Sequence, residues 1–534
     1  MKTNPGTYHI EIQTHRKNPY GIIRTSYREN GKVKHKTIAT LPGLTLEQLR
    51  AMQAALQCKS LPKADFKILS SREFGASYVA LSIAKELGLH KMIHSHYSQD
   101  WVKSSLAMII GRLVFQGSKL SLSHCSSYSA LWEVCGIAGN IDVDTHCYES
   151  MDKLFVRQEA IQQALAKKHL QDGTLVLYDI TSCYMEGEYE NSEIVEFGYN
   201  RDRKRGHEQI VISLPCNKDG CPVAAEVFKG NTKDETTVID KINELKQKYG
   251  LERVVFVGDR GMVTQAVYDK IDHATVKSIT ALNHGNIQEL CDKGTIQMSL
   301  FDEMNIVEII DGDVRYMLCK NPAMKQKEAT ARKRLLELTC AELDKIVAST
   351  RKTKYSKAVR VGRVIDKYKM SKFIIIEGSD NSVTYKLNND KIEKESALDG
   401  CYIVLTDVPA DDMSALDTVK SYKSLIKVEQ AFRSLKTTQL EMRPIYHKTD
   451  DRIKCHVFIC MLAYYIMWHM KQRLKPLAEV DGVGKDRKFS FKYIIECLKS
   501  IRREEVQFLD AKINITTTPT EEQSNLLKLL GVAV

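Results

Sequence analysis

The chain has 534 residues, enough for about three or four domains of typical size. Hydrophobic residues make up 43% and charged residues 27%, with only 11 Pro and 28 Gly, which excludes disordered, collagen-like and low-complexity proteins. The formal net charge of +11 favours an anionic partner such as nucleic acid, although a basic surface without any specific partner gives the same value.

The positive charge is concentrated in two stretches. Residues 1–70 hold 12 Lys or Arg against four acids, and a second basic stretch runs from Lys325 to Lys372. Both are candidate contacts to a phosphate backbone, with a solvated charged face as the alternative. The 14 Cys form no CxxC pair. Cys216 and Cys221, separated by four residues, leave a structural zinc site open beside the simpler interpretation of buried, reduced thiols.

The first 70 residues predict a small basic module of strands and one helix. Apolar and polar residues alternate over the first 40 positions, and Glu29-Asn30-Gly31-Lys32 is typical of a hairpin turn. A helix is predicted to begin at Thr45, with Thr45 as N-cap and Gln48 as its capping-box partner. Residues 71–170 then show helical periodicity, as in YVALSIAKELGL.

Residues 171–284 change to short apolar runs typical of strands. The predicted order is strand, strand, strand, helix, strand, over residues 174–181, 208–214, 222–228, 236–249 and 253–258. The first and the last of these strands each end on an acid, Asp179 and Asp259. We interpret this region as the first part of a catalytic core.

The rest of the chain divides into three predicted parts. Residues 285–398 hold strand-like runs around one long charged helix, from about Gln326 to Ser349, and predict a mainly β insertion subdomain. Residues 399–475 begin with a strand at 401–407 and continue as helices, and we interpret them as the second part of the core. Residues 476–534 are predicted to be a helical tail. No signal peptide is expected, and the longest apolar run, Val457 to Trp468, is shorter than a membrane span.

The two acids suggest a metal site. A helix N-cap would explain one of them, but the order of elements with acids on the first and fourth strands is the layout of the RNase H-like fold, an α/β core with a mixed sheet flanked by helices. There the two strands are neighbours, so the carboxylates meet at the C-terminal edge of the sheet. Adjacent carboxylates repel each other, and a divalent cation with hard oxygen ligands, Mg²⁺ or Mn²⁺, offsets that repulsion. Such a site requires a third carboxylate.

The segment YKSLIKVEQAFRSLK supplies this third acid as Glu429. On one continuous helix, Tyr422, Glu429 and Lys436 fall within about 40° of one another, and Arg433 lies on the same side. An adjoining apolar stripe of Val428, Ala431, Phe432 and Leu435 would dock on the sheet. The alternative is an amphipathic helix with Glu429 and Arg433 as a surface ion pair.

At these residues the sequence resembles the DDE transposases of bacterial insertion sequences, in the group with a Tyr-x2-Arg-x3-Glu-x6-Lys signature (the IS-four superfamily). The matching pieces are YDIT around Asp179, VGDRGM around Asp259, YKSLIKVEQAFRSLK around Glu429, and also GYNRDRK, GNTKDETT, MRPIYH and DRIKCHVFICMLAYY. The resemblance covers most of the chain from about residue 70 to 475.

The resemblance implies roles for individual residues. Asp179, Asp259 and Glu429 would form the catalytic, metal-binding triad, with Mg²⁺ as cofactor and Mn²⁺ as a substitute. Tyr422 and Lys436 would contact the DNA end near the cleavage site. The signature Arg is replaced by Leu425. We infer that Arg433, which the helical wheel places on the same face, takes over its phosphate contact.

A basic loop after the first core strand provides further candidates for DNA-backbone contacts: Arg201, Arg203, Lys204 and Arg205. The resemblance implies a cut-and-paste transposase in the bacterial cytosol, nucleoid-associated when bound to DNA. It would act as a homodimer on double-stranded DNA, both the terminal inverted repeats and the target. Two alternatives remain open: an RNase H-like nuclease that hydrolyses DNA without strand transfer, and an inactive DNA-binding relative that acts as a repressor.

Overall fold

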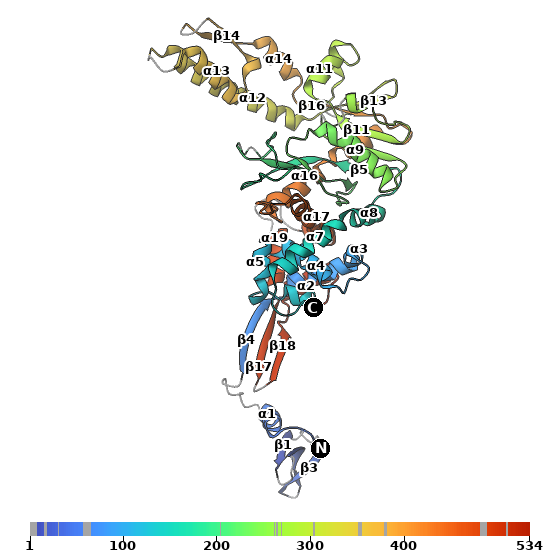
Figure 1. The fold of residues 1–534 in the computed structure, drawn as a ribbon, viewed down its shortest axis with the longest axis vertical. Helices are drawn as coiled ribbons and strands as arrows, with labels where there is room; N and C mark the ends of the chain where they lie inside the picture. Colours follow the sequence, from blue (N-terminus) through green and yellow to red (C-terminus); the bar gives the residue numbers. More distant parts are fainter. Residues whose placement is uncertain are drawn as a thin grey trace.

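The structure is a computed structural model that describes residues 8–14, 19–29, 31–56, 66–202, 204, 206–260, 262, 265–268, 270–302, 305–350, 355–378, 382–480, 489–508 and 511–534. Figure 1 shows its elements following one another along a long axis. An N-terminal module lies at one end, a group of helices and a mixed sheet occupy the middle, and helices α12 and α13 extend at the other end.

The N-terminal module has the predicted mixture of strands and one helix. It contains an antiparallel sheet and a helix: β1 (Tyr8–Gln13), β2 (Tyr20–Glu29), β3 (Lys32–Leu41) and α1 (Leu46–Leu56). Glu29 pairs with Lys32, which confirms the predicted hairpin, although Asn30 lies outside the described residues. The predicted capping box is confirmed too. The Gln48 backbone N–H donates to Thr45 Oγ1 at 3.2 Å, and the Thr45 N–H donates to Gln48 Oε1 at 2.9 Å.

The helices predicted between residues 71 and 170 are confirmed, and they pack around one long helix from further along the chain. They are α2 (Gly75–Glu86), α3 (Leu89–Ile93), α4 (Asp100–Val114), α5 (Lys119–Ser123), α6 (Leu131–Val134), α7 (Glu149–Val156) and α8 (Gln158–His169). The long helix is α17 (Asp450–Arg473), which packs against α4, α7 and α2. It is long and apolar enough to cross a membrane, but 83% of its apolar window is buried inside the protein, as expected for a core helix.

A seven-stranded mixed sheet forms the centre of the α/β part. Its strand order is β12 (Val307–Asp311), β13 (Val314–Lys320), β16 (Cys401–Thr406), β11 (Val276–Ala281), β10 (Val254–Gly258), β5 (Thr174–Tyr178) and β8 (Cys216–Asn217). Strand β10 runs parallel to both β5 and β11, whereas the other pairs are antiparallel. Along the chain, the short α10 (Gln265–Tyr268) follows β10, and α11 (His284–Asp292) follows β11.

Helices cover both faces of this sheet because its strands are apolar on both sides. Tyr178 and Phe256 pack on one face with helix α9 (Asp234–Gln247). Leu177 and Val257 point to the opposite face and belong to the large core that also contains Val428 and Phe432 of α16 (Ile426–Arg433). Helix α15 (Ala415–Lys423) precedes α16 and packs against β10, β11 and β16. The predicted apolar stripe of α16 is therefore buried as expected.

The strand that carries Asp179 changes sheets at that residue. Strand β5 pairs with β10, and after Asp179 the chain continues as β6 (Ile180–Tyr184), which pairs with β7 (Gln209–Ser213). Strand β9 (Glu226–Lys229) pairs with the other edge of β7. Asp179 directly follows the last residue of β5, as predicted, and it also lies at a junction between two sheets, which was not predicted.

The region predicted as a mainly β insertion is mostly helical in the residues that the structure describes, so that prediction is wrong. Helices α12 (Pro322–Ala348), α13 (Lys357–Tyr368) and α14 (Asn389–Ala397) outweigh the hairpin of β14 (Ile374–Glu377) and β15 (Thr384–Leu387). Strands β12 and β13 were predicted as part of the insertion, but they extend the main sheet. The amphipathic helix α13, which buries Val361 and Ile365 on one face, was overlooked among the strand-like runs.

The sequence predicts a purely helical C-terminal tail, and this prediction is wrong. It contains α18 (Lys475–Val480), α19 (Phe491–Lys499) and α20 (Glu521–Leu530), but also a hairpin of β17 (Arg502–Phe508) and β18 (Ala511–Thr516). Strand β17 pairs with β4 (Phe66–Glu73) to give a three-stranded sheet. The pairing brings together segments more than 400 residues apart, and the charged run RREEVQF has little local signal for a strand.

Candidate active site

Asp179 and Asp259 follow two paired residues of neighbouring parallel strands. Tyr178 of β5 is the register partner of Gly258 of β10, and each aspartate is the next residue in its chain. The predicted adjacency of the two strands is therefore confirmed. Backbone contacts hold the position of both acids: Leu214 N–H donates to the Asp179 carbonyl at 3.2 Å, and Thr280 Oγ1 donates to the Asp259 carbonyl at 3.3 Å.

The Asp179 carboxyl lies in an environment that opposes its ionisation. Burial raises the pKa of Asp179 to about 7. The Ile180 N–H, which donates to Oδ1 at 2.8 Å, has the opposite effect because it favours the charged form. The negative charges of Asp259 and Glu429 raise this pKa further, while the Arg201 guanidinium lowers it. Asp259 and Glu429 thus both lie close enough to Asp179 to disfavour its charge.

Glu429 is not on the continuous helix that the sequence predicted. The chain passes through a tight turn at Ser424 and Leu425, where N–H groups bond carbonyls three residues back, and this turn separates α15 from α16. After α16 the chain forms a π-helical turn, η6 (Ser434–Thr438). Tyr422, Glu429 and Lys436 therefore lie on three successive helical segments, so one regular α-helical wheel does not describe their relative directions. Leu425, in place of the signature Arg, is a buried core residue.

Tyr422 contacts one of the three acids directly. Its hydroxyl donates to Asp259 Oδ1 at 3.4 Å, from the last turn of α15. Burial raises the pKa of Tyr422 to about 12, and the Asp259 charge acts in the same direction. The phenol therefore stays protonated and acts as a hydrogen-bond donor to the carboxylate at neutral pH.

Lys436 is buried, which differs from the DNA contact predicted for it. Its ammonium donates to Thr181 Oγ1 at 2.6 Å, to the Ser182 carbonyl and to Asp202 Oδ1 at 3.1 Å. Burial lowers the pKa of Lys436, with the Asp202 charge opposing that effect. The other carboxylate oxygen of Asp202 lies 2.6 Å from Arg443 Nη1. Lys436 thus fastens the start of β6, next to Asp179, to η6.

The predicted basic contacts fall into three groups. The Arg201 guanidinium is half-buried and donates to the Ile180 carbonyl at 2.6 Å, so it faces the active site from within the protein. Lys204 is exposed, 5.5 Å above the Tyr184 ring, and Arg433 is exposed on α16. Arg203 and Arg205 lie outside the described residues. Sequence reasoning overlooked Asp202 and Arg443, although both stand in quoted motifs, GYNRDRK and MRPIYH.

Comparison with known proteins places this arrangement in a family. Residues 171–466, more than half of the chain and including all three acids, match the family described as Transposase DDE domain. The chain belongs to this family. Residues 10–67 match the family described as IS1634 family transposase, N-terminal domain. This protein is therefore an insertion-sequence DNA transposase, an enzyme that cleaves DNA and depends on a divalent metal ion.

No curated protein matches the transposase in sequence. Among solved structures, it is similar to a piggyBac transposase in a synaptic complex with hairpin DNA. The two chains are 8% identical, the match covers 80% of this chain and 76% of the other, and the TM-score is 0.36.

The three acids of the transposase suit a divalent cation by their chemistry. Their carboxylate oxygens are hard ligands, and a cation would offset both the burial of Asp179 and the effect of the Asp259 and Glu429 charges on it. Within the described residues their oxygens are not all within 4.8 Å of one another, unlike the ligand atoms of one other group, His169, Cys221 and His469. Three acids around a single ion would need such spacing, whereas two ions that share one acid would not.

Proposed function

We propose that Asp179, Asp259 and Glu429 are the catalytic residues of an RNase H-like core and hold Mg²⁺, with Mn²⁺ as a substitute. The observation that carries this proposal is the position of Asp179 and Asp259 directly after paired residues of β5 and β10, with the Glu429 charge of α16 also acting on Asp179. In cut-and-paste transposition, the core would nick DNA at the element's terminal inverted repeats and then join the freed 3′-hydroxyl to target DNA.

The chain's own residues position the reacting groups. The Ile180 N–H fixes one oxygen of Asp179, and the Tyr422 hydroxyl orients Asp259. Arg201 places a positive charge beside Asp179, where phosphodiester charge would accumulate during the reaction. Bound Mg²⁺ would supply Lewis-acid activation of a water or 3′-hydroxyl and stabilisation of the leaving oxygen.

The DNA would lie against exposed cations around this edge of the core. We propose Lys204 and Arg433 as phosphate contacts because both are exposed, Arg433 four residues after Glu429 and Lys204 in the basic loop that also carries Arg201. DNA contacts by Arg203 and Arg205 remain predictions from the sequence. Tyr422 would contact the DNA end while its hydroxyl also donates to Asp259. Action as a homodimer on paired ends, in the bacterial cytosol, completes the proposal.

The test uses the purified full chain and a duplex that carries one end of its own element with flanking DNA. We expect nicked and joined products with Mg²⁺, none with EDTA, and recovery when Mg²⁺ is restored. Cleavage without any joined product would leave only a nuclease. End binding that survives EDTA with no cleavage in any divalent metal would indicate a repressor and contradict the proposal.

Tyr422→Phe should reduce the cleavage rate by about 5- to 30-fold, because losing one hydrogen bond to a charged group costs on the order of 1–2 kcal/mol. The loss should shrink at high Mg²⁺ concentration, since the phenol acts by orienting Asp259. Tyr446→Phe is the matched control, because that ring is 66% exposed. A Tyr422→Phe variant with normal metal dependence and weaker DNA binding would instead support a direct DNA contact.

A further inference from the structure

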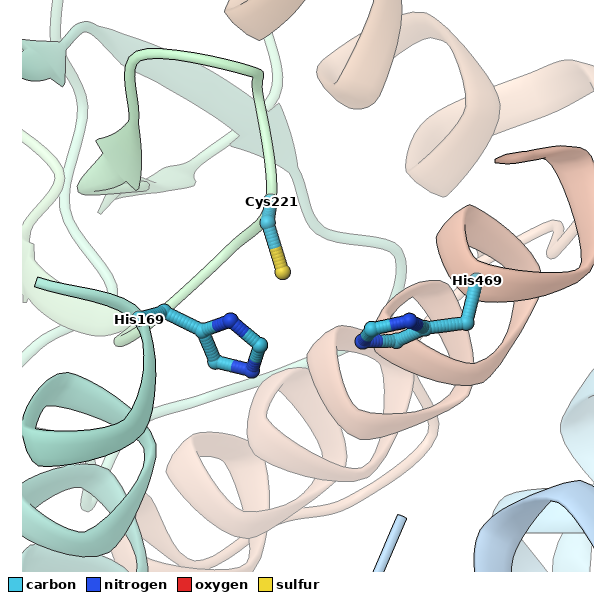
Figure 2. Close-up of side chains that lie close together, drawn as sticks. All are labelled: His169, Cys221 and His469. Carbon is cyan, nitrogen blue, oxygen red and sulfur yellow. The ribbon is translucent and has the colours of Figure 1, made fainter. Parts of the chain in front are cut away.

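A second group of metal-binding side chains lies apart from the three acids. His169, Cys221 and His469 each place a ligand atom within 4.8 Å of the other two. Figure 2 shows the two imidazole rings and the Cys221 thiol directed toward a common point. The residues come from the last turn of α8, the segment after β8 and the C-terminal part of α17. The sequence had left open a zinc site at Cys216 and Cys221, but Cys216 does not belong to this group.

The hydrogen bonds around the group leave its ligand atoms available. His469 Nε2 is buried without a hydrogen-bond partner among the described residues. His169 uses Nε2 for a bond of 2.8 Å with the Tyr465 hydroxyl, which leaves Nδ1 as its free ligand atom. Metal-bound histidines usually engage their second nitrogen in such a bond, which fixes the ring and its tautomer. The Cys221 thiol has only a weak contact, 4.0 Å from the Pro222 carbonyl.

The surroundings keep both imidazoles uncharged, which is the form that binds a metal ion. Burial lowers the pKa of His169 and of His469 to about 4, so both rings are neutral and can bind metal at neutral pH. His169 lies in the last turn of α8, where the helix dipole favours positive charge. Two nearby cations, Lys168 and Arg473, act against positive charge at this group, although Arg473 is paired with Glu86.

We propose that His169, Cys221 and His469 bind a zinc-class transition-metal ion that is distinct from the catalytic metal. Two imidazoles and one thiolate are a borderline-soft ligand set, which favours Zn²⁺ over the Mg²⁺ suited to the three carboxylates. Ligand atoms around tetrahedral zinc lie about 3.3–3.6 Å apart, so small side-chain movements from the present spacing close the site. Binding releases the Cys221 proton to solvent, and water fills the fourth position.

The ion would tie the catalytic sheet to the helical part of the protein. The segment with Cys221 follows β8, whose Cys216 pairs with Leu177 of the strand that leads to Asp179. His169 and His469 belong to the helices packed beside it. The proposed ion is therefore structural and would support the edge of the sheet at β8.

The test measures zinc in the full-length protein expressed in zinc-containing medium and purified without chelator. We expect about one tightly held Zn²⁺ per chain in the wild type, in Asp259→Asn and in Cys216→Ser, which removes an equally buried thiol. Cys221→Ser and His469→Gln should lose it. Cobalt substitution should give a thiolate-to-cobalt charge-transfer band in the wild type and in Cys216→Ser but not in Cys221→Ser.

Three results would overturn the proposal: folded wild type with no retained zinc, zinc retained unchanged in both ligand variants, or zinc lost in Asp259→Asn. If the ligand variants do not fold, the test is the melting temperature of the Asp259→Asn protein with and without a chelator. Removing zinc from the second site should lower that temperature. An unchanged melting temperature would show that the group is a packed pair of neutral histidines and a reduced thiol. The proposal does not depend on the role assigned to the three acids.

Discussion

Replacing Asp259 with Asn should lower the rate of end cleavage by at least about 10³-fold, because a carboxylate that holds the metal and balances charge in the transition state is lost. The amide keeps the size of the side chain and can still accept the Tyr422 hydrogen bond at Oδ1. The loss should therefore appear in the chemical step, with binding of the DNA end retained. Asp411→Asn, an exposed acid between β16 and α15, is the matched control.

The same variant should be as stable as the wild type, or slightly more stable, in metal-free buffer. The folded-state pKa of Asp179, about 7, lies above the value of about 4 for an unfolded aspartate, so its ionisation costs stability as the pH rises between these values. Removing the Asp259 charge lowers the pKa of Asp179 and reduces that cost. Mg²⁺ should raise the melting temperature of the wild type more than that of the variant. An Asp259→Asn variant that cleaves DNA ends at the wild-type rate would show that Asp259 is not a catalytic residue.

The strand part of the site could be predicted from sequence because its signals are local. The apolar runs before Asp179 and Asp259 are too short for helices, and their order with one intervening helix fixes which strands are neighbours. The change of sheets at Asp179 could not be read in this way. It depends on the pairing of β6 with β7, whereas the residues on both sides of Asp179 suit an uninterrupted strand.

The helical part of the site was harder to predict because its geometry depends on tertiary packing. Ser424 and Leu425 are compatible with a continuous helix, yet the chain turns there so that Leu425 enters the core. The turn and the following π-helical segment invalidate a helical wheel from Tyr422 to Lys436. The zinc-class group has no local signature at all, since its ligands come from three segments that meet only in the fold.

Lys436→Met tests whether this signature lysine stabilises the folded protein or contacts a DNA phosphate. The structure predicts a loss of about 3 kcal/mol in the free energy of unfolding, because the variant removes the ammonium from a buried ion pair with Asp202. Asp202 keeps Arg443 as a partner, which limits the loss, while Thr181 and Ser182 lose their donor. Chemical denaturation of the metal-free protein measures the change. Lys420→Met is the matched control, since that lysine is exposed and its nearest acid is 3.6 Å away.

Cleavage and DNA binding should respond differently to this substitution. Lys436 holds the first residues of β6, directly after Asp179, so its loss should slow cleavage by displacing that acid. The affinity of the folded variant for the DNA end, and the dependence of that affinity on salt, should stay as in the wild type, because a buried ammonium displaces no counterions from DNA. A salt slope reduced by about one, with normal stability, would instead make Lys436 a phosphate contact, as the resemblance implied. That result would require η6 to open when DNA binds, since the Lys436 ammonium reaches solvent only by leaving Asp202.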